Sequence, residues 1–489
     1  MANNGQTAGP VPLLINNEDV VTETQFDVCS PATGQTLHCG SSASLGHVDR
    51  AVAAARAAFP AWKAMRPYAR RDLLFRAADA MLARQDEFVR YQMDETGAAR
   101  PFVEHTFLLG VSLLRDFAAR IPSIEGSLPA VAQDGEGALV WKEPYGVVLA
   151  IAPWNAPFIL GVRAVAIPLA AGNTTILKGS ELAPRCFWAI GDAFREAGLP
   201  AGCLNVVYHR PADAAAVTTA LIAHPLVRKI SFTGSTHVGA IVAAMAGEHT
   251  KPVLLELGGK ASAIVLDDAD LQRAATQCIE GAFKHSGQIC MTTERIVVQR
   301  KVADEFRRLL VATADQLHGD TTAPPVLVNE AAVRKCKGLV ADAVAKGARL
   351  LFGQLETADH NAIDAPDQCR ARMRPVVVDN TTPDMALYAT ESFGPIVSLF
   401  VVDTEEEAIS LANDTEYGLT AAVFTRDLLR GFRVAKALET GAVHINGNTV
   451  HDEPVLPHGG WKSSGYGRFG GTGGYDEFLQ TKTVTWAEK

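Results

Sequence analysis

The sequence predicts an α/β fold made of two doubly wound α/β domains and a small β arm. Three observations lead to this prediction. Residues before 128 have mostly the pattern of helices, each with one apolar stripe. From Gly146 to Glu256, short β-branched runs alternate with helical segments, which is typical of βαβ units in a parallel sheet. A second series of the same kind follows Gly259.

The expected elements follow from these patterns in chain order. The N-terminal helical pattern is clearest where Leu73, Leu74, Ala77 and Met81 recur at i, i+1, i+4 and i+8. The strands expected in the first series are residues 147–151, 174–178, 204–208, 229–233 and 252–256. Those expected in the second series are residues 262–266, 295–299, 395–402, 420–424 and 442–446. The two series meet near residues 257–260.

Two segments fit neither series and are predicted to form the arm. Residues 128–146 have the pattern of a polar hairpin with the turn QDGEG, and residues 478–489 alternate like a lone edge strand. An unpaired strand edge favours pairing with a second chain. We therefore expect the arm to assemble the protein into a homodimer or a homotetramer.

Composition argues against several classes of function. The 489 residues include 45 Lys and Arg and 54 Asp and Glu, so the formal charge is −9, and neither a nucleic-acid nor an anionic-membrane partner is expected. The longest uncharged apolar stretch, Val147–Val162, is broken by prolines and too short to cross a bilayer. The N-terminus lacks the basic segment of a secretory signal. The eight cysteines are scattered without a C-x-x-C pair, as in a cytoplasmic protein with reduced thiols.

Three residues at predicted strand ends or turns have side chains suited to catalysis. Cys290 lies between a helical segment and a strand, where a nucleophile is accessible. Glu256 ends a predicted strand, and Asn155 follows the first strand of the first series, where open α/β sheets bind ligands. Taken singly, each has a plainer interpretation: a buried free cysteine, a carboxylate in a turn and a turn amide between two prolines.

Seven motifs in one order carry a resemblance to a known family. They are PWNAP (153–157), GNTTILKGSE (172–181), FTGSTHVG (232–239), ELGGK (256–260), GQIC (287–290), ESFGP (391–395) and PHGGWKSSGYGR (457–468). With these motifs the chain resembles the aldehyde dehydrogenase superfamily over essentially its whole length. The segments APWNAPFILGVRA, FKHSGQICMTTERI and NGNTVHDE are most similar to its salicylaldehyde and vanillin dehydrogenase branch.

The resemblance implies NAD-dependent oxidation of a small-molecule aldehyde, aromatic or polar-substituted, to its carboxylic acid. Cys290 would add to the carbonyl as a thiolate, while the Asn155 amide and the Cys290 backbone N–H would stabilise the oxyanion of the thiohemiacetal. After hydride passes to the nicotinamide, Glu256 would activate the water that hydrolyses the resulting thioester. No metal is expected.

The resemblance also implies which residues hold the cofactor. Lys178 and Glu181 match the pair that binds the adenosine ribose, and a carboxylate at Glu181 repels a 2′-phosphate, which favours NAD, with NADP as the alternative. Backbone N–H groups where a strand meets a helix suit a pyrophosphate, and there the matches are Gly234, Ser235 and Gly239. The other matches are Ile151, Trp154 and Leu257, together with Glu391 and Phe393 at the nicotinamide ribose and ring.

The aldehyde channel of the family is matched by one face of the helix after Asn155 and by other segments. The face carries Ala156, Ile159, Leu160 and Arg163, which the helical period places together. Arg163 has two interpretations, either an internal ion pair with an acid or a donor to a hydroxyl or carboxylate on the substrate. The other channel matches are Ile289, Met291, Val450, Asp452 (the acid that could pair with Arg163) and His458, which stands where PFGG-type relatives have Phe.

The domain assignment also follows from the resemblance. It implies a Rossmann-like NAD-binding domain, a catalytic domain, a C-terminal return that lines the channel, and the oligomerisation arm. Their expected ranges are, in that order, 1–127 with 147–257, 258–443, 444–477, and 128–146 with 478–489.

Three other functions stay open at this point. His285, five positions before Cys290, allows a Cys–His hydrolase, which would make no use of the cofactor motifs. A dehydrogenase that passes the thioester to coenzyme A generally lacks the general base that Glu256 supplies. A catalytically silent binding homologue would have no need of all three catalytic matches together.

Overall fold

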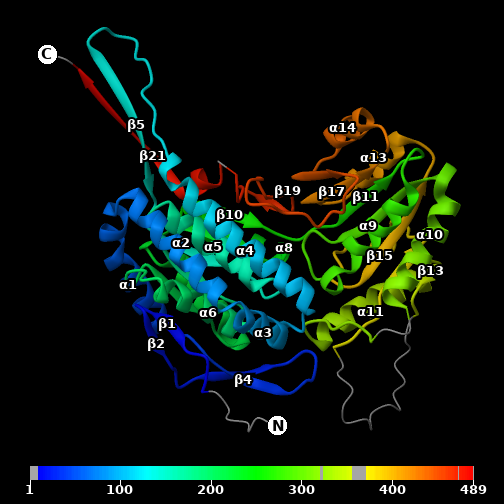
Figure 1. Cartoon of the computed structure of the whole chain (residues 1–489), viewed down its shortest axis with the longest axis horizontal. Coiled ribbons are helices and arrows are strands. Elements are labelled where there is room, and N and C mark those ends of the chain that lie inside the picture. The colour runs from blue at the N-terminus through cyan, green and yellow to red at the C-terminus, as the bar shows by residue number, and fades with distance from the viewer. Residues whose placement is uncertain (1–8, 320–322, 355–370, 472, 488–489) are drawn as a thin grey trace.

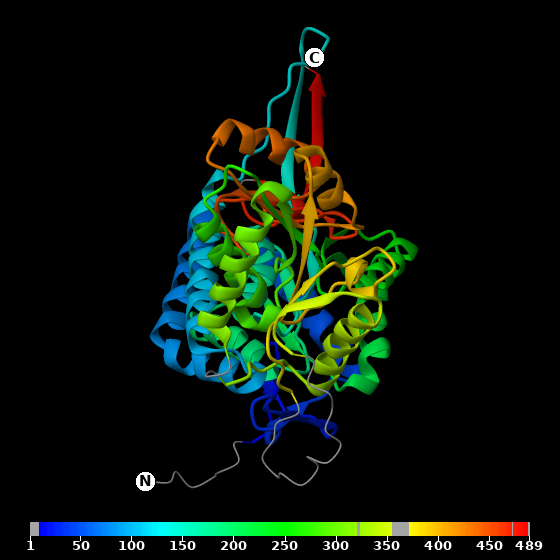
Figure 2. The same cartoon turned by 90° about the vertical axis from the view of Figure 1, so that its right-hand side faces the viewer.

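A computed structural model of the chain describes residues 9–319, 323–354, 371–471 and 473–487. It has two lobes, each built on a mainly parallel sheet with helices on both faces, and a two-stranded arm that projects from the first lobe (Figures 1 and 2). The predicted fold class is confirmed.

The sheet of the first lobe has eight strands in the order β2-β1-β8-β7-β6-β9-β10-β20. Its central strands run parallel. They are rich in buried Val, Ile and Leu, as expected for strands covered on both faces. These five strands match the predicted first series and are β8 (Leu204–Val207), β7 (Thr174–Lys178), β6 (Val147–Ile151), β9 (Val227–Thr233) and β10 (Val253–Glu256).

Helices cover both faces of this sheet. On one face lie α1 (Leu45–Ala64), α7 (Ala214–Ala223) and α8 (Thr236–Glu248). On the other lie α5 (Pro157–Ala170) and α6 (Pro184–Glu196), beneath a second layer of α2 (Pro67–Ala83), α3 (Gln85–Thr96) and α4 (Arg100–Arg120). Because α5 lies between the sheet and α4, every one of its residues is buried.

The N-terminal region was expected to be mostly helical, and it also contains four short strands. β1 (Leu13–Ile15) and β2 (Glu18–Val20) form a hairpin whose two loop residues, Asn16 and Asn17, have φ of 57° and 62°. Such a left-handed pair forms the type I′ turn that suits a two-residue hairpin, and Asn tolerates it. β3 (Gln25–Cys29) and β4 (Thr36–Ser41) form a second antiparallel pair. The Asn-Asn pair between short apolar runs is a turn signal that the helical interpretation overlooked.

The sheet of the second lobe has seven strands in the order β13-β14-β15-β12-β11-β17-β18. All its strands except β13 run parallel, and β14 and β13 were not predicted. The strands are β11 (Ala261–Val265), β12 (Thr293–Gln299), β13 (Arg349–Phe352), β14 (Val376–Asp379), β15 (Ile396–Val402), β17 (Thr420–Phe424) and β18 (Ala442–Ile445). The helices around it are α9 (Leu271–Phe283), α10 (Arg300–His318), α11 (Glu330–Ala345), α12 (Ala386–Ala389), α13 (Glu405–Asn413) and α14 (Leu428–Ala437).

One short segment near the C-terminus links the two lobes. β19 (Trp461–Lys462) pairs with β16 (Tyr417–Gly418) of the second lobe, and β20 (Gly465–Tyr466) pairs with β10 of the first. The hydroxyl of Ser464, between these strands, donates to the Gly258 carbonyl at 2.6 Å and accepts from the Gly418 N–H at 2.9 Å. This link holds the carboxyl end of β10 against the second lobe.

The arm consists of β5 (Glu136–Pro144) and β21 (Leu479–Ala487), paired antiparallel along their whole length. The prediction of a lone C-terminal strand is therefore wrong, because β21 has β5 as its partner. The structure gives no strand pair within residues 128–146. Val140 instead forms one isolated bridge with Ser127, just before that range, through two backbone hydrogen bonds. Figures 1 and 2 show both strands extending away from the body.

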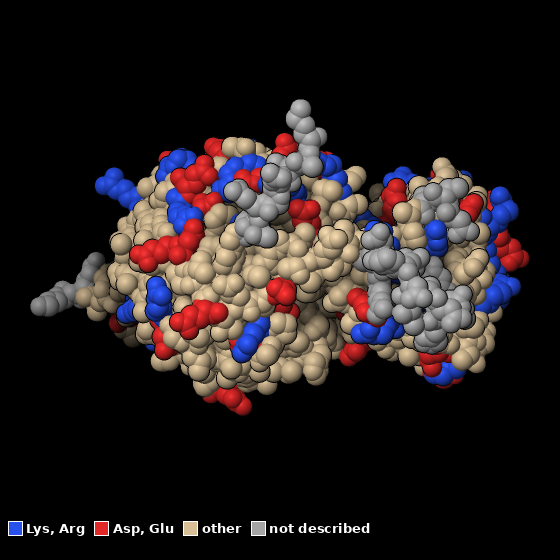
Figure 3. Space-filling model, turned by 90° about the horizontal axis from the view of Figure 1, so that it is seen from below, with Lys and Arg blue, Asp and Glu red and all other residues tan. Residues whose placement is uncertain are grey.

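Three features bear on the compositional analysis: the charges on one face, the helices and the cysteines. On the face shown in Figure 3, acidic and basic side chains are interspersed rather than gathered into one basic surface. Within the described ranges, no helix combines the length and the apolar character needed to span a membrane. Seven cysteines are free thiols, and Cys369 lies outside the described residues.

Candidate active site

Two cavities meet at Cys290. The first, of about 240 Å³, lies against the ends of β6, β9 and β10, and we call it the strand-end cavity. The second, of about 290 Å³, lies between α4, α5 and the segment 450–458, and we call it the helix cavity. Asn155, Leu160 and Cys290 line both. A molecule in either cavity can therefore reach the Cys290 thiol.

The strand-end cavity lies where sheet topology predicts a ligand site. The strand order reverses between β6 and β9, and ligands of open α/β sheets bind outside the carboxyl ends of strands at such a point. The cavity is lined by Pro153, Trp154 and Asn155 after β6, Thr233, Gly234 and Ser235 at the end of β9, Glu256, Leu257 and Gly258 from β10, and Leu160, Cys290, Lys335, Glu391 and Phe393.

The loop that carries Cys290 is fixed by an unusual backbone. After α9, the short helix η3 (Lys284–Gly287) contains three successive residues with positive φ, namely His285, Ser286 and Gly287. The next carbonyl, that of Gln288, accepts a hydrogen bond from the Asn155 side chain at 2.9 Å. A Cβ on Gly259 would lie 2.4 Å from the Cys290 carbonyl oxygen, so only glycine permits this approach of the segment after β10 to the loop.

The Asn155 side chain is placed to serve as a donor beside Cys290. It is buried, and one of its two amide N–H groups is used by the Gln288 carbonyl. Because a carboxamide has two N–H donors, the other remains for an oxygen at the thiol. The hydrogen bond to Gln288 thus orients the amide that the sequence singled out.

Glu256 carries a buried carboxylate next to Cys290. The residue is 1% exposed, and within the described residues neither carboxylate oxygen receives a hydrogen bond. Its closest ionic neighbour is the imidazole of His458, with Nε2 3.6 Å from Oε1. Burial raises the pKa of Glu256, but His458, the Cys290 thiol and Arg163 outweigh burial and hold the pKa below its ordinary value. Glu256 is therefore an ionised base at neutral pH.

The thiol of Cys290 is difficult to ionise in this setting. Burial raises the pKa of Cys290 well above its ordinary value, and the negative charges of Glu256 and Glu391 raise it further. The same Glu256 carboxylate is the base that can take the thiol proton. Because Glu256 becomes protonated when it takes the Cys290 proton, the protonation states of the two groups are coupled.

A buried ion pair supports the far wall of the strand-end cavity. Lys260 Nζ lies 2.5 Å from Glu294 Oε2, and both side chains are buried. Glu294 also accepts hydrogen bonds from the backbone N–H and the hydroxyl of Ser392 and from the Phe393 N–H. Glu391 accepts from the Gly259 N–H at 2.9 Å, and burial with the charge of Glu294 raises the pKa of Glu391 to about 7. This network positions the segment ESFGP.

Of the remaining predicted cofactor residues, Trp154, Gly234, Ser235 and Leu257 line the strand-end cavity, whereas Ile151, Lys178, Glu181 and Gly239 do not. Lys178 ends β7, where burial lowers its pKa and Glu181 opposes that shift. Ser235 is the N-cap of α8, accepting from the Val238 N–H at 3.4 Å. Gly239 packs on Leu257, since a Cβ there would lie 2.4 Å from the leucine side chain. The other placements are Ile151 at the end of β6 and Trp154 edge-on to Phe393 with ring centroids 5.9 Å apart.

The helix cavity brings together all nine residues matched to the aldehyde channel. Ala156, Ile159, Leu160, Arg163, Ile289, Met291, Val450, Asp452 and His458 line it. Sequence reasoning missed the wall formed by α4, because these residues lie in no motif. That wall consists of Phe102, His105, Thr106 and Leu109, and Lys335 on α11 is a similar omission in the strand-end cavity.

Arg163 forms the ion pair that the sequence left open. Its guanidinium is hydrogen-bonded to Asp452, both side chains are buried, and it lies over the Phe469 ring at 5.5 Å. Arg163 nevertheless lines the helix cavity. The two interpretations of Arg163 are therefore compatible, since a paired guanidinium retains further donors.

His285 is placed unlike the histidine of a Cys–His hydrolase. Its ring stacks on Phe102 with centroids 4.4 Å apart, and burial lowers its pKa to about 4. His285 lines neither cavity at Cys290. The structure thus favours a packing role for this imidazole.

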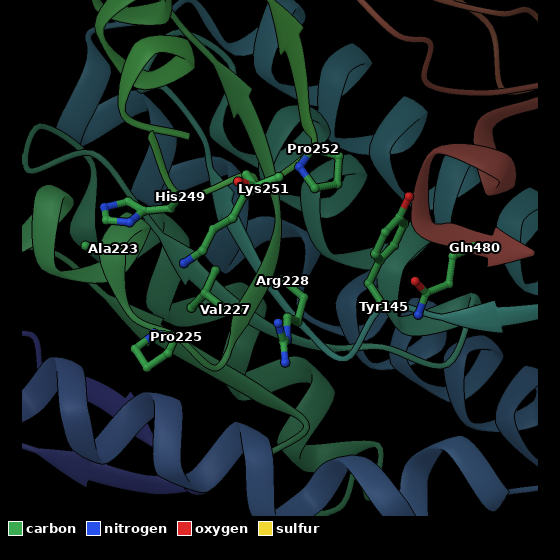
Figure 4. Close-up of a pocket in the computed structure, with 10 residues that line it drawn as sticks. Tyr145, Ala223, Pro225, Val227, Arg228, His249, Lys251, Pro252 and Gln480 are labelled. Carbon is green, nitrogen blue, oxygen red and sulfur yellow. The ribbon is translucent and has the colours of Figure 1, made fainter. Parts of the chain in front are cut away.

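A third cavity, of about 600 Å³, lies at the foot of the arm and shares no residue with the other two (Figure 4). Tyr145 and Gln480 border it on one side and Arg228 and Lys251 on the other. The Lys251 ammonium donates to the Ile222 and His224 carbonyls at the end of α7. This lysine therefore stabilises a helix end, and the cavity is remote from the residues suited to catalysis.

Comparison with known proteins agrees with this geometry. The chain matches the family model of the Aldehyde dehydrogenase family over residues 18–484. It is 44% identical over 483 residues to a vanillin dehydrogenase of Pseudomonas fluorescens, and 37% identical over 482 residues to a salicylaldehyde dehydrogenase of Pseudomonas putida, each covering 97% of both chains. A crystal structure of a salicylaldehyde dehydrogenase from Pseudomonas putida G7 with salicylaldehyde has a TM-score of 0.93 and 36% identity, covering 98% of this chain and 99% of that one. The chain belongs to the aldehyde dehydrogenase family.

Proposed function

We propose that this protein oxidises an aromatic aldehyde to its carboxylic acid with NAD, through covalent intermediates on Cys290. The observation that carries the proposal is the junction of two cavities at one thiol. There the Asn155 amide and the Glu256 carboxylate are the polar groups suited to acyl chemistry. One cavity would hold the cofactor and the other the aldehyde.

The strand-end cavity suits the pyrophosphate and nicotinamide parts of a dinucleotide. It lies at the switch point of the sheet, and α8 begins there, so backbone N–H groups and the helix dipole favour a pyrophosphate. A side chain at Gly258 would crowd the cavity wall, because a Cβ there would lie 2.6 Å from Glu391 Oε2. Gly234 and Ser235 would hold the pyrophosphate, Lys178 and Glu181 the adenosine ribose, and Glu391 and Phe393 the nicotinamide end. When bound, the nicotinamide supplies the hydride acceptor.

In the first half of the reaction, Glu256 takes the proton of the Cys290 thiol and Sγ bonds to the carbonyl carbon. The oxygen of the thiohemiacetal becomes negative, and the second N–H of Asn155 with the backbone N–H of Cys290 stabilises it. Loss of one such hydrogen-bond donor lowers the reaction rate by about 10²–10³-fold. Loss of hydride from this adduct leaves a thioester on Cys290.

Before the second half, Glu256 gives up the thiol proton. It then accepts a proton from water while the water oxygen attacks the thioester carbon. The C–S bond then breaks, which releases the carboxylic acid and frees Cys290. The pKa of Glu256, held low by its neighbours, keeps the carboxylate ionised for this step.

A panel of aldehydes assayed by NADH absorbance tests the proposal. We expect turnover with benzaldehyde and its substituted derivatives, and a carboxylic acid as the product. Parallel reactions with coenzyme A test the acylating alternative, in which a thioester of coenzyme A would accumulate. Absence of NADH formation with every aldehyde would indicate a silent homologue.

The choice between NAD and NADP depends on Glu181 in this proposal. Glu181→Gln removes a charged acceptor for the ribose hydroxyls, and we expect NAD binding to weaken by about 1.5–3 kcal/mol. Use of NADP should improve relative to NAD, since the carboxylate no longer repels a 2′-phosphate. The measurement is kcat/KM with each cofactor, and an unchanged ratio would show that Glu181 lies away from the ribose.

Arg163 should favour substrates with a polar substituent. Arg163 lines the helix cavity, and with its Asp452 pair intact it keeps further donors that a polar substituent could meet. We expect the double variant Arg163→Leu with Asp452→Asn, which leaves no carboxylate unpaired, to lose about 1.5–3 kcal/mol in kcat/KM for hydroxy- or carboxy-benzaldehydes. Benzaldehyde itself should lose much less. An equal loss on both substrates would assign Arg163 a structural role only.

The arm is proposed to assemble the protein into a homodimer or homotetramer. β5 and β21 extend from the body with Trp141 and Trp486 exposed. Among the described residues the outer edge of β21 has no partner strand, and that of β5 has only the bridge to Ser127. Deleting residues 479–489 should lower the mass measured by light scattering to that of a smaller assembly. An unchanged mass would show that the interface lies elsewhere on the protein.

A cytoplasmic location of the protein is also proposed, and it would keep the Cys290 thiol reduced.

A further inference from the structure

Glu256 is buried, so the proton that it takes from the attacking water has no direct path to solvent. Hydrolysis of a thioester consumes one water and yields a carboxylate, the Cys290 thiol and one proton. Glu256 collects the proton of the attacking water, yet its side chain is 1% exposed and none of the described residues donates a hydrogen bond to it. A base that is closed off in this way must pass its proton to a neighbour before the next turnover.

His458 is the neighbour that the structure provides. Its Nε2 lies 3.6 Å from Glu256 Oε1, and its side chain is 10% exposed. His458 lines the helix cavity, whereas Glu256 lines the strand-end cavity. Its backbone is held by two hydrogen bonds to Phe469, at 2.7 and 2.8 Å. The imidazole thus lies between the buried base and the substrate side of the thiol.

We infer that His458 relays the deacylation proton from Glu256 to the helix cavity, an inference that rests on the proposed function. As water attacks, its O–H bond breaks, a proton binds to Glu256, and the new C–O bond replaces the C–S bond of the thioester. Glu256 then gives this proton to His458 Nε2, and the imidazolium releases a proton from Nδ1 to water in the cavity. Imidazole suits this task because its two nitrogens accept and donate in turn.

The charges around His458 fit a transient imidazolium. Glu256 faces one side of the ring, and on the cavity side Asp452 is already neutralised by Arg163. His444 lies close enough for His451, His458 and Asp452 to affect it, and burial, followed by His451 and His458, lowers the pKa of His444 to about 4. His444 therefore stays neutral and does not repel the imidazolium. The other titratable or charged groups near this path are Cys290, His105, Lys284, His451, Glu453 and Arg468.

The test measures decay of the acyl-enzyme directly. The holoenzyme with NAD is mixed with benzaldehyde, quenched in acid at successive times, and the thioester on Cys290 is quantified by mass spectrometry. In His458→Phe we expect acylation close to that of the wild type and a deacylation rate lower by about 10²-fold or more. Added imidazole should restore part of the rate. Because His458 helps to hold the pKa of Glu256 low, the acid limb in the pH profile of deacylation should move to higher pH in the variant.

His458→Gln separates a relay from a simple hydrogen bond. Glutamine can donate to Glu256 but cannot accept and release a proton at neutral pH. We expect His458→Gln to deacylate as slowly as His458→Phe, while His249→Phe, in the cavity at the foot of the arm, should behave as the wild type. Wild-type deacylation in either His458 variant would overturn the relay.

Failure of the relay can be told apart from failure of the proposed function. If Glu256→Gln accumulates thioester while both His458 variants deacylate normally, only the relay is wrong. If Cys290→Ala still forms NADH, the covalent mechanism itself is wrong. Equal loss of acylation and deacylation in the folded His458→Phe protein would also overturn the relay, because it would indicate general damage to the site.

Discussion

Cys290→Ala is expected to abolish NADH formation from every aldehyde, whereas Glu256→Gln is expected to form one NADH per active site and then stop. The first variant has no nucleophile at the junction of the two cavities, so no hydride donor forms. The second still forms the thioester but lacks the base for its hydrolysis. Its acylation should also slow, because Glu256 no longer takes the thiol proton.

Stopped-flow absorbance gives the size of the NADH burst, and mass spectrometry of the stalled Glu256→Gln enzyme should show the acyl group on Cys290. Cys29→Ala, at an exposed cysteine far along the chain, serves as a control and should retain full activity. Steady turnover by pure Cys290→Ala would refute the mechanism. Steady turnover by Glu256→Gln would assign the hydrolytic base to another residue.

Glu294→Gln is expected to lower the free energy of unfolding by about 3–5 kcal/mol, the range for removing one partner of a buried ion pair. The variant leaves the Lys260 ammonium buried without its counter-charge, 1% exposed in the wild type. It also weakens the acceptor for three hydrogen bonds from Ser392 and Phe393. Cofactor binding should weaken too, since these bonds position Glu391 and Phe393.

Urea unfolding monitored by circular dichroism measures this change. The control is Glu104→Gln, which breaks an exposed pair with Arg100 on α4 and should cost about 0.3–0.5 kcal/mol. A loss of similar size in both variants would mean that burial does not strengthen the Lys260–Glu294 pair. Normal stability with weakened NAD binding would limit the role of Glu294 to holding the ESFGP segment.

The parallel strands could be predicted from the sequence because each is indicated by its own few consecutive residues. Val147–Ile151 and Thr174–Lys178 are continuous β-branched or aliphatic runs, and burial on both faces requires that composition. The lone-strand interpretation of Leu479–Ala487 failed because its partner, β5, lies more than three hundred positions earlier in the chain. When two paired strands are so far apart in the chain, the sequence of neither strand indicates which segment is its partner.

For a similar reason, the sequence predicted the catalytic residues of the site but not all of the residues that line its cavities. Cys290, Glu256 and Asn155 lie in short motifs, and the structure brings them to one junction. Phe102 and Lys335 lie on long helices whose sequences resemble any amphipathic helix, and only tertiary packing turns them toward the cavities. The pairing of Arg163 with Asp452 was foreseeable as an alternative, because a buried guanidinium requires a partner.

The shared wall between the two cavities has a consequence for inhibitor design. Among the described residues, only Asn155, Leu160 and Cys290 border both spaces. A single molecule with an electrophile at its centre could therefore extend one half toward the nicotinamide region and the other toward α4. Joining two weak fragments in this way gives the second fragment a high effective concentration. Selectivity over other dehydrogenases would then come from the half that contacts Arg163 and His458, while the half in the strand-end cavity would contribute affinity.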